Sequence, residues 1–70
     1  MLKFKCTWLS GYGDADGQSE VFTLEELKDH NLEAYLGDYW INDFNMLNIG
    51  EEFLVGGPSG YEEVKYERIA

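Results

Sequence analysis

The chain has 70 residues, of which 44% are apolar and 16% aromatic, and its formal net charge at pH 7 is −9. This length allows a single small domain, and the many large rings exclude an intrinsically disordered chain, because they supply the apolar area that a core needs. Fourteen acidic against five basic side chains exclude direct binding to nucleic acid or to anionic membranes, both of which need clustered Lys and Arg.

The cysteine content and the N-terminus point to an intracellular protein. Cys6 is the single cysteine, so no intramolecular disulfide forms, and small domains without disulfides are typical of the cytosol. The first residues lack the apolar run and the small-residue cleavage site of a signal peptide. No apolar stretch approaches the ~20 residues of a membrane span. We therefore expect a cytoplasmic protein.

The N-terminal quarter predicts two strands joined by a loop. Residues 2–8 alternate between apolar and polar side chains, which indicates a half-buried strand. Residues 10–19 hold three glycines among polar residues and predict a loop. Residues 20–23 are long enough for a short second strand. The apolar positions of the first strand are Leu2, Phe4, Cys6 and Trp8.

The centre of the chain predicts helix. Thr23 and Glu26 have the spacing of a capping box, in which each side chain bonds to the backbone N–H of the other residue. A second amphipathic pattern covers residues 32–40, with Asn31 as its expected N-cap. Gly37 lies within this pattern and weakens it by about 1 kcal/mol relative to Ala. Either one kinked helix or two short helices fits.

The C-terminal third predicts a hairpin. Residues 41–50 are rich in Asn and Asp and indicate a connector, which Phe44, Leu47 and Ile49 would anchor to the core. Residues 51–55 predict a strand, residues 56–60 a turn containing Pro58, and residues 61–69 a final strand. The predicted fold class is α+β, in the order β(β)ααββ: a three- or four-stranded, mostly antiparallel sheet with helix on one face.

We find no pattern that indicates catalysis. Cys6 and His30 are conceivable as a nucleophile and its base, but Cys6 lies on the apolar face of a strand, where a thiol is usually inert. His30 suits the end of a helix, where the dipole favours it. Paired carboxylates such as residues 62–63 fall on opposite faces of a strand. The chain is therefore expected to be no enzyme and to use no cofactor.

One loop has part of the pattern of a calcium site. Asp14, Asp16 and Glu25 match positions 1, 3 and 12 of an EF-hand loop. Position 6 is Ser19 rather than Gly, and the preceding segment predicts a strand rather than a helix. Asp and Gly are also the residues that tight turns favour, so we interpret the loop as a turn without metal.

The acidic side chains are the remaining candidates for function. Glu25, Asp29 and Glu33 would share one face if the helix were continuous. Such a row fits the solvated side of an amphipathic helix, or a set of carboxylates that imitates phosphates for a basic cleft. Tyrosines expected to be exposed, namely Tyr12, Tyr61 and Tyr66, would serve as anchors. The candidate partner-binding residues are Asp14, Asp16, Glu25, Glu26, Asp29, Glu33, Asp38 and Asp43.

Two segments carry a resemblance to a known group of proteins. The first segment begins with residues 49–57 (IGEEFLVGG), continues through a glycine-rich turn and closes with a strand that ends in Glu67-Arg68-Ile69. The second segment is residues 23–27 (TLEEL). Together they resemble small acidic accessory proteins encoded by bacteriophages and mobile elements. Some of these are anti-CRISPR or other anti-defence proteins. The resemblance implies a bacterial host cytoplasm and a role in blocking a host protein.

The expected function is therefore binding without turnover. The leading hypothesis is an inhibitor that occludes a basic nucleic-acid-binding site on a host protein, for example a CRISPR effector. The alternative is a small regulatory or assembly module without inhibitory activity. Such a module could form a homodimer by pairing an exposed sheet edge. The first predicts binding that salt weakens, whereas the second predicts self-association with little dependence on salt.

Overall fold

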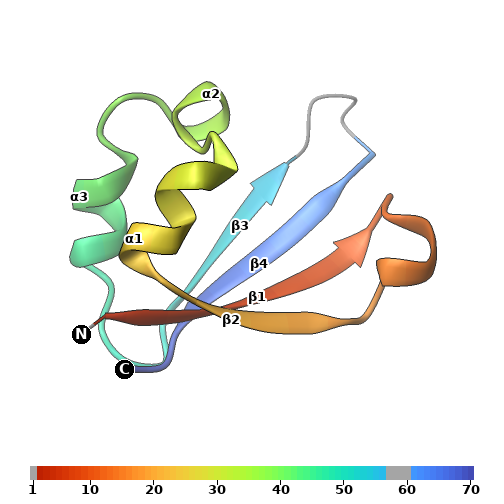
Figure 1. Cartoon of the computed structure of the whole chain (residues 1–70), viewed down its shortest axis with the longest axis horizontal. Helices are drawn as coiled ribbons and strands as arrows, with labels where there is room; N and C mark the ends of the chain where they lie inside the picture. The colour runs from red at the N-terminus through yellow and green to blue at the C-terminus, as the bar shows by residue number, and fades with distance from the viewer. Residues whose placement is uncertain (1, 57–60) are drawn as a thin grey trace.

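The computed structural model describes residues 2–56 and 61–70, and these form an α+β fold (Figure 1). Four strands and three short α-helices follow one another, with two 3₁₀ turns between them. The strands are β1 (Lys3–Ser10), β2 (Ser19–Thr23), β3 (Glu52–Gly56) and β4 (Glu63–Arg68). The helices are α1 (Leu24–Leu27), α2 (Glu33–Leu36) and α3 (Trp40–Asn45), and the 3₁₀ turns are η1 (Gly13–Ala15) and η2 (Lys28–His30).

The four strands form one antiparallel sheet in the order β2-β1-β4-β3. The alternation predicted for the first strand is confirmed, because Phe4 and Cys6 are buried while Lys3 and Lys5 are exposed. Across the β1–β4 pair, Trp8 lies opposite Val64 and Ser10 opposite Glu63. One residue of β1 therefore bulges out of the ladder near the end of the strand.

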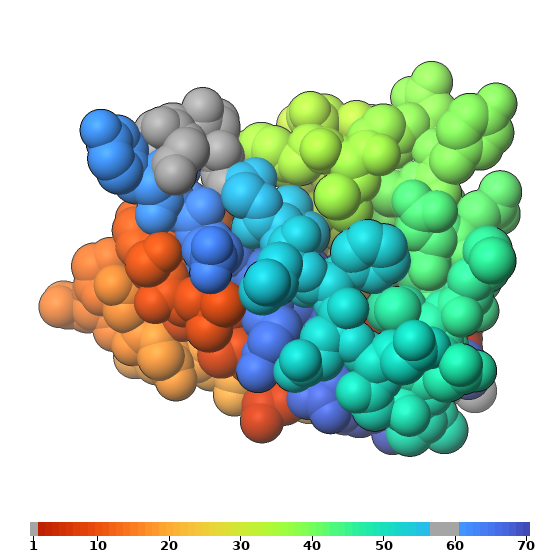
Figure 2. All heavy atoms as spheres, turned by 180° about the vertical axis from the view of Figure 1, so that it is seen from behind, coloured from red at the N-terminus to blue at the C-terminus, as the bar shows by residue number. Residues whose placement is uncertain are grey.

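The three α-helices lie together on one side of the sheet, whereas η1 lies in the loop that joins β1 to β2 (Figure 1). We call residues 24–51, which connect β2 to β3, the helical layer. The opposite side of the sheet is its open face, where the strands themselves form the surface (Figure 2). This arrangement confirms the predicted fold class, since an antiparallel sheet needs cover on only one face.

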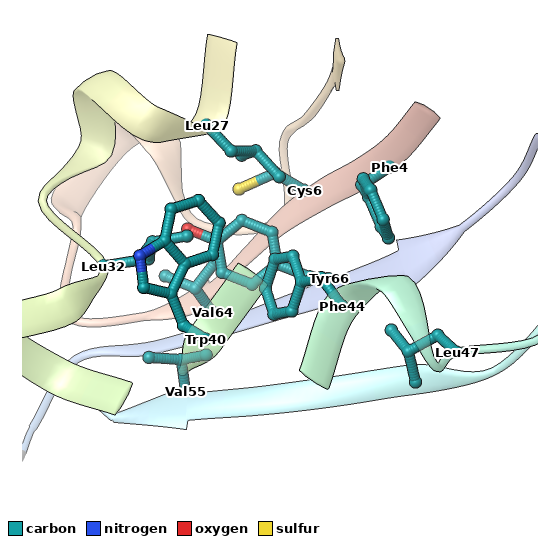
Figure 3. Packing of buried hydrophobic residues seen from close by; sticks show 10 residues of the cluster. All are labelled: Phe4, Cys6, Leu27, Leu32, Trp40, Phe44, Leu47, Val55, Val64 and Tyr66. Atoms are coloured by element: carbon teal, nitrogen blue, oxygen red, sulfur yellow. The ribbon is translucent and has the colours of Figure 1, made fainter. Parts of the chain in front are cut away.

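The core lies between the sheet and the helical layer, and Phe44 of α3 is at its centre (Figure 3). Its ring centroid is 5.2 Å from that of Phe4, 5.5 Å from Trp40, 5.6 Å from Phe53 and 5.4 Å from Tyr66. Tilted and edge-on rings at such distances attract one another beyond the area that they bury. A single side chain thus ties α3 to three strands.

The predicted capping box is present at the start of α1. The backbone N–H of Glu26 donates to Thr23 Oγ1 at 3.2 Å, and the N–H of Thr23 donates to Glu26 Oε1 at 2.9 Å. The hydrogen bonds from Thr23 hold the pKa of the Glu26 carboxyl below its usual range. This box sets the point where the chain leaves β2 and enters the helical layer.

Two details of the predicted helices are wrong. Asn31 is not an N-cap; it has a φ of 57° and ends η2, while Leu32 occupies the N-cap position of α2. Asn tolerates the left-handed region better than most residues, which suits it to this break. Gly37, with a φ of 87°, ends α2, so residues 32–40 form no continuous helix.

The predicted connector at residues 41–50 is also wrong in part, because α3 occupies half of it. Phe44 and Leu47 are buried as expected, whereas Ile49 is 68% exposed and anchors nothing. Burial of Trp40 and Phe44 on one side of α3 outweighs the weak helix propensity of its Asn and Asp residues. The predicted turn with Pro58 falls largely on residues 57–60, outside the described residues.

Candidate acidic surface and aromatic pocket

All eight predicted partner-binding carboxylates belong to exposed residues. Two of them, Asp14 and Asp16, lie in the loop between β1 and β2, at and just after η1. The others are spread over the helical layer: Glu25, Glu26, Asp29, Glu33, Asp38 and Asp43. The structure thus places six of the eight candidates on one layer of the molecule.

Three of these carboxylates also have local structural partners. Asp16 Oδ1 accepts a hydrogen bond from the backbone N–H of Tyr12 at 2.9 Å. Glu25 forms an ion pair with Lys28 at 3.0 Å, and Glu26 is the capping carboxylate of α1. A ligand would have to compete with these contacts. The better candidates for contact with a partner are therefore the other five carboxylates: Asp14, Asp29, Glu33, Asp38 and Asp43.

The predicted acidic row on one helix face does not form. Glu25 belongs to α1 and Glu33 to α2, and the left-handed residue Asn31 turns the chain between them. The spacing i, i+4, i+8 aligns side chains only along an unbroken helix. The carboxylates are therefore distributed over several short segments.

The resemblance to a calcium loop has no counterpart in the fold. Asp14 and Asp16 lie beside η1, whereas Glu25 lies in α1 beyond a complete strand. Within residues 2–56 and 61–70, no group of three or more His, Cys, Asp or Glu side chains is placed to hold a metal ion.

The open face of the sheet is close to neutral. Side chains alternate along a strand, so the register places three lysines and three glutamates on this face: Lys3, Lys5, Lys65, Glu52, Glu63 and Glu67. Lys5 lies opposite Glu67, and Lys65 Nζ is 3.1 Å from Glu52. These six charges cancel.

The whole excess of negative charge is therefore outside the open face. Removing the six cancelling residues from fourteen acids and five bases leaves eleven carboxylates against Lys28 and Arg68. Arg68 is turned inward and donates to the backbone oxygen of Leu47 at 2.6 Å. The helical layer alone carries seven carboxylates and one lysine. Charge is thus segregated by the fold.

A pocket of about 220 Å³ lies where the helical layer meets the β3 end of the sheet. Aromatic side chains from distant parts of the chain line it. Trp8 comes from β1, Tyr12 from the following loop, Tyr35 from α2 and Tyr66 from β4. His30 lines it as well, and no lysine, arginine or carboxylate of the described chain does. A volume below ~300 Å³ suits one side chain rather than a drug-sized molecule.

Cys6 and Tyr66 meet at the inner end of this pocket (Figure 3). Burial raises the pKa of the Cys6 thiol to about 11, and burial also raises the pKa of the Tyr66 phenol. A hydrogen bond with Tyr66 opposes the shift of the Cys6 pKa in part. Both groups are therefore protonated and uncharged at neutral pH, and the thiol is not a nucleophile.

This buried pair predicts a loss of stability in alkali. The pKa of the thiol is 9.0 in an unfolded chain but about 11 in the fold. Between pH 9 and pH 11 the unfolded state therefore loses a proton that the folded state keeps. The free energy of unfolding should be independent of this group below pH 9 and fall from pH 9 to pH 11. Urea unfolding across this range measures it.

The Cys6→Ala variant is the control for the other groups that titrate in alkali. Its free energy of unfolding should fall less steeply between pH 9 and pH 11, because Tyr66 alone then remains of the pair. Equal slopes for the variant and the natural chain would contradict the assignment to Cys6.

The tyrosines expected as anchors divide between three environments. Tyr61 is 83% exposed, Tyr12 is half-buried at the pocket, and Tyr66 is only 5% exposed, so the prediction for Tyr66 is wrong. Tyr66 alternates with the charged residues Lys65 and Glu67 in β4, a pattern that would have placed it in the core. Trp8 and Tyr35 were not predicted as site residues, since nothing local brings them together.

Comparisons with protein-family models, with curated proteins and with solved structures found no match. None of the helices in the described part of the chain is long and apolar enough to cross a membrane.

Proposed function

We propose that this protein is a non-catalytic acidic inhibitor, encoded by a phage or mobile element, that occludes a basic nucleic-acid-binding site on a host protein. The observation that carries the proposal is the segregation of charge. Eleven carboxylates and two basic side chains lie outside the neutral open face of the sheet. A basic partner attracts such a surface over about 10 Å at ~0.1 M salt.

The carboxylates suit a phosphate-binding cleft because they are exposed and separated. Asp29, Glu33, Asp38 and Asp43 follow one another along the helical layer on different short segments. Lysines and arginines that bind a nucleic-acid backbone meet one negative charge after another. Single carboxylates spread over one layer offer them the same kind of partner without a nucleotide.

The molecule is also large enough to block such a site. A typical stable interface takes about 800 Å² from each partner. The whole accessible surface is 4504 Å², so less than a fifth of it would suffice. The helical layer can supply this area while the open face of the sheet stays free. The resemblance of the C-terminal hairpin to phage accessory proteins favours the same function.

A matched pair of variants tests the proposal. The helical-layer variant Asp29→Asn/Glu33→Gln/Asp38→Asn and the sheet-face variant Glu52→Gln/Glu63→Gln/Glu67→Gln each remove three negative charges. Each variant and the natural chain are immobilised and exposed to a bacterial lysate at about 50 mM and about 200 mM salt. Captured proteins are identified by mass spectrometry and then purified.

The natural chain should retain a basic nucleic-acid-binding protein at the lower salt, release most of it at the higher salt, and compete with DNA or RNA for it in a gel-shift assay. The helical-layer variant should bind this partner at least tenfold more weakly, and the sheet-face variant should bind it as the natural chain does. Equal loss in both variants, or a partner that still binds nucleic acid when saturated, would refute the proposal.

The alternative, a regulatory or assembly module, draws on the two outer strands. Of the described strands, β2 and β3 each pair with one neighbour only, and Leu54 of β3 is 62% exposed. An edge of this kind can pair with a second copy. A dimer in sedimentation experiments that salt does not weaken, without a basic partner, would favour this alternative.

A further inference from the structure

The aromatic pocket borders the core, from which Cys6 and Tyr66 line it, whereas its other large rings, Trp8, Tyr12 and Tyr35, lie nearer the surface. Trp8, Tyr12 and Tyr35 are only partly buried, and Tyr35 is 45% exposed. Trp8 and Tyr12 pack against the core on one side. Together with Tyr35 they also border a space of about 220 Å³. The chemistry of the walls and of the inner end decides what this space can hold.

The inner end of the pocket accepts hydrogen bonds better than it donates them. A phenol has one donor and two acceptor lone pairs. The Tyr66 oxygen, next to the Cys6 thiol at this end, offers its lone pairs to a ligand. The thiol is at most a weak donor. A ligand that brings N–H groups fits this end, and an anion does not.

The electrostatic surroundings also select a cation. Glu20 pairs with Cys6 across β1 and β2, and its charge acts on the thiol; Glu62 acts in the same way on Tyr12. No described lysine or arginine lines the pocket. Ring faces attract cations by about 0.5 to 2 kcal/mol, with the larger values where water is excluded. Among the described lining residues, His30 is the one with a basic side chain.

From these features we infer that the pocket receives the guanidinium group of an arginine on the basic partner. Arginine fits better than lysine, because its group is planar, stacks on aromatic rings and is more weakly hydrated than an ammonium. A volume for one side chain matches one arginine. This inference rests on the proposed function for the identity of the partner, but the pocket itself can be tested without that partner.

The probe is the peptide acetyl-Gly-Arg-Gly-amide, titrated into the ¹⁵N-labelled chain at fixed ionic strength. The same peptide with citrulline is the matched control, because citrulline has the shape of arginine without its charge. Trp8 and Trp40 give two indole N–H signals, one at the pocket and one in the core. The Trp8 signal should shift saturably with the arginine peptide, with a Kd of about 1 mM or weaker, and the Trp40 signal should not.

The Tyr35→Ala variant should weaken arginine binding about 2- to 30-fold, as the loss of one cation–π contact predicts. Tyr39→Ala is its matched control, since Tyr39 is 76% exposed in the same layer but does not line the pocket. It should bind the peptide as the natural chain does. The exposure of both residues leaves the fold intact in either variant.

Several outcomes would overturn the inference: equal shifts with the citrulline peptide, no saturable shift at tens of millimolar arginine peptide, or equal binding by Tyr35→Ala. The proposed function fails separately. If the helical-layer variant loses its basic partner while the arginine peptide does not bind, the proposed function is supported and the arginine pocket is refuted. If the peptide binds but no basic partner is captured, the arginine pocket is supported and the proposed function is refuted.

Discussion

Replacing Phe44 by alanine should reduce the free energy of unfolding by about 3 to 5 kcal/mol. The Phe44 side chain is completely buried and contacts four other rings, with centroid distances of 5.2 to 5.6 Å. Truncation removes these contacts together and leaves a cavity between α3 and the sheet. The free energy of unfolding of folded domains is about 0.05 to 0.15 kcal/mol per residue, which gives roughly 4 to 10 kcal/mol for a chain of this length.

Urea unfolding followed by circular dichroism measures the effect of Phe44→Ala. Since this variant could be unfolded even without urea, Phe44→Leu provides a second point, with a smaller loss because fewer atoms are removed. Met46→Ala is the control; Met46 is 80% exposed two residues further on, and its loss should change stability by less than about 0.5 kcal/mol. A Phe44→Ala variant as stable as Met46→Ala would contradict the packing described.

Replacing Gly11 by alanine should destabilise the fold by about 2 to 5 kcal/mol. Gly11 has a φ of 84°, which costs an L-residue roughly 1 to 2 kcal/mol. A Cβ added there would lie 2.7 Å from the Cα of Glu62 and 3.0 Å from its backbone N. Backbone atoms cannot rotate away as a side chain does, so the strands must separate, at a further cost of about 1 to 3 kcal/mol.

Gly17→Ala isolates the two contributions to this effect. Gly17 has the same φ of 84°, but an added Cβ would meet nothing within 4 Å. Its substitution should therefore cost only the conformational part, about 1 to 2 kcal/mol. The difference between the two variants, measured by thermal or urea unfolding, reports the close approach to Glu62 alone. Equal losses would show that this approach contributes nothing.

The parts of the fold that local patterns determine were predictable from the sequence. Strict alternation around Phe4 and Cys6 indicated β1, and the spacing of Thr23 and Glu26 indicated the start of α1. Both signals involve residues within a few positions of one another. The fold class followed from the order of these elements.

The errors lie where tertiary contacts outweigh local preference. The Asn- and Asp-rich residues of α3 favour a loop on propensity, but burial of Trp40 and Phe44 stabilises a helix there. Asn31 had the residue type of an N-cap, yet its side chain caps nothing and its backbone turns left-handed. Choosing between these two roles of Asn requires the path of the chain on both sides.

The candidate site was predictable in its composition but not in its arrangement. Net charge and the exposure of the eight carboxylates follow from the sequence, whereas the near-neutral open face depends on the register of β1, β3 and β4. The Trp and Tyr rings that line the pocket come from four segments that meet only in the fold. Trp8 and Tyr35 are separated by a strand, a loop and two turns of helix, so no periodicity connects them.

The cancellation of charge on the open face has a consequence for the way in which the molecule meets other molecules. Because the excess charge lies elsewhere, the electric field around the protein has a direction, and a basic surface turns the approaching molecule so that its helical layer faces forward. Fewer encounters then begin in an unproductive orientation. Three of the four lysine amines lie on the open face of the sheet, which points away from such a surface. A label or support coupled to these amines would therefore leave the helical layer accessible.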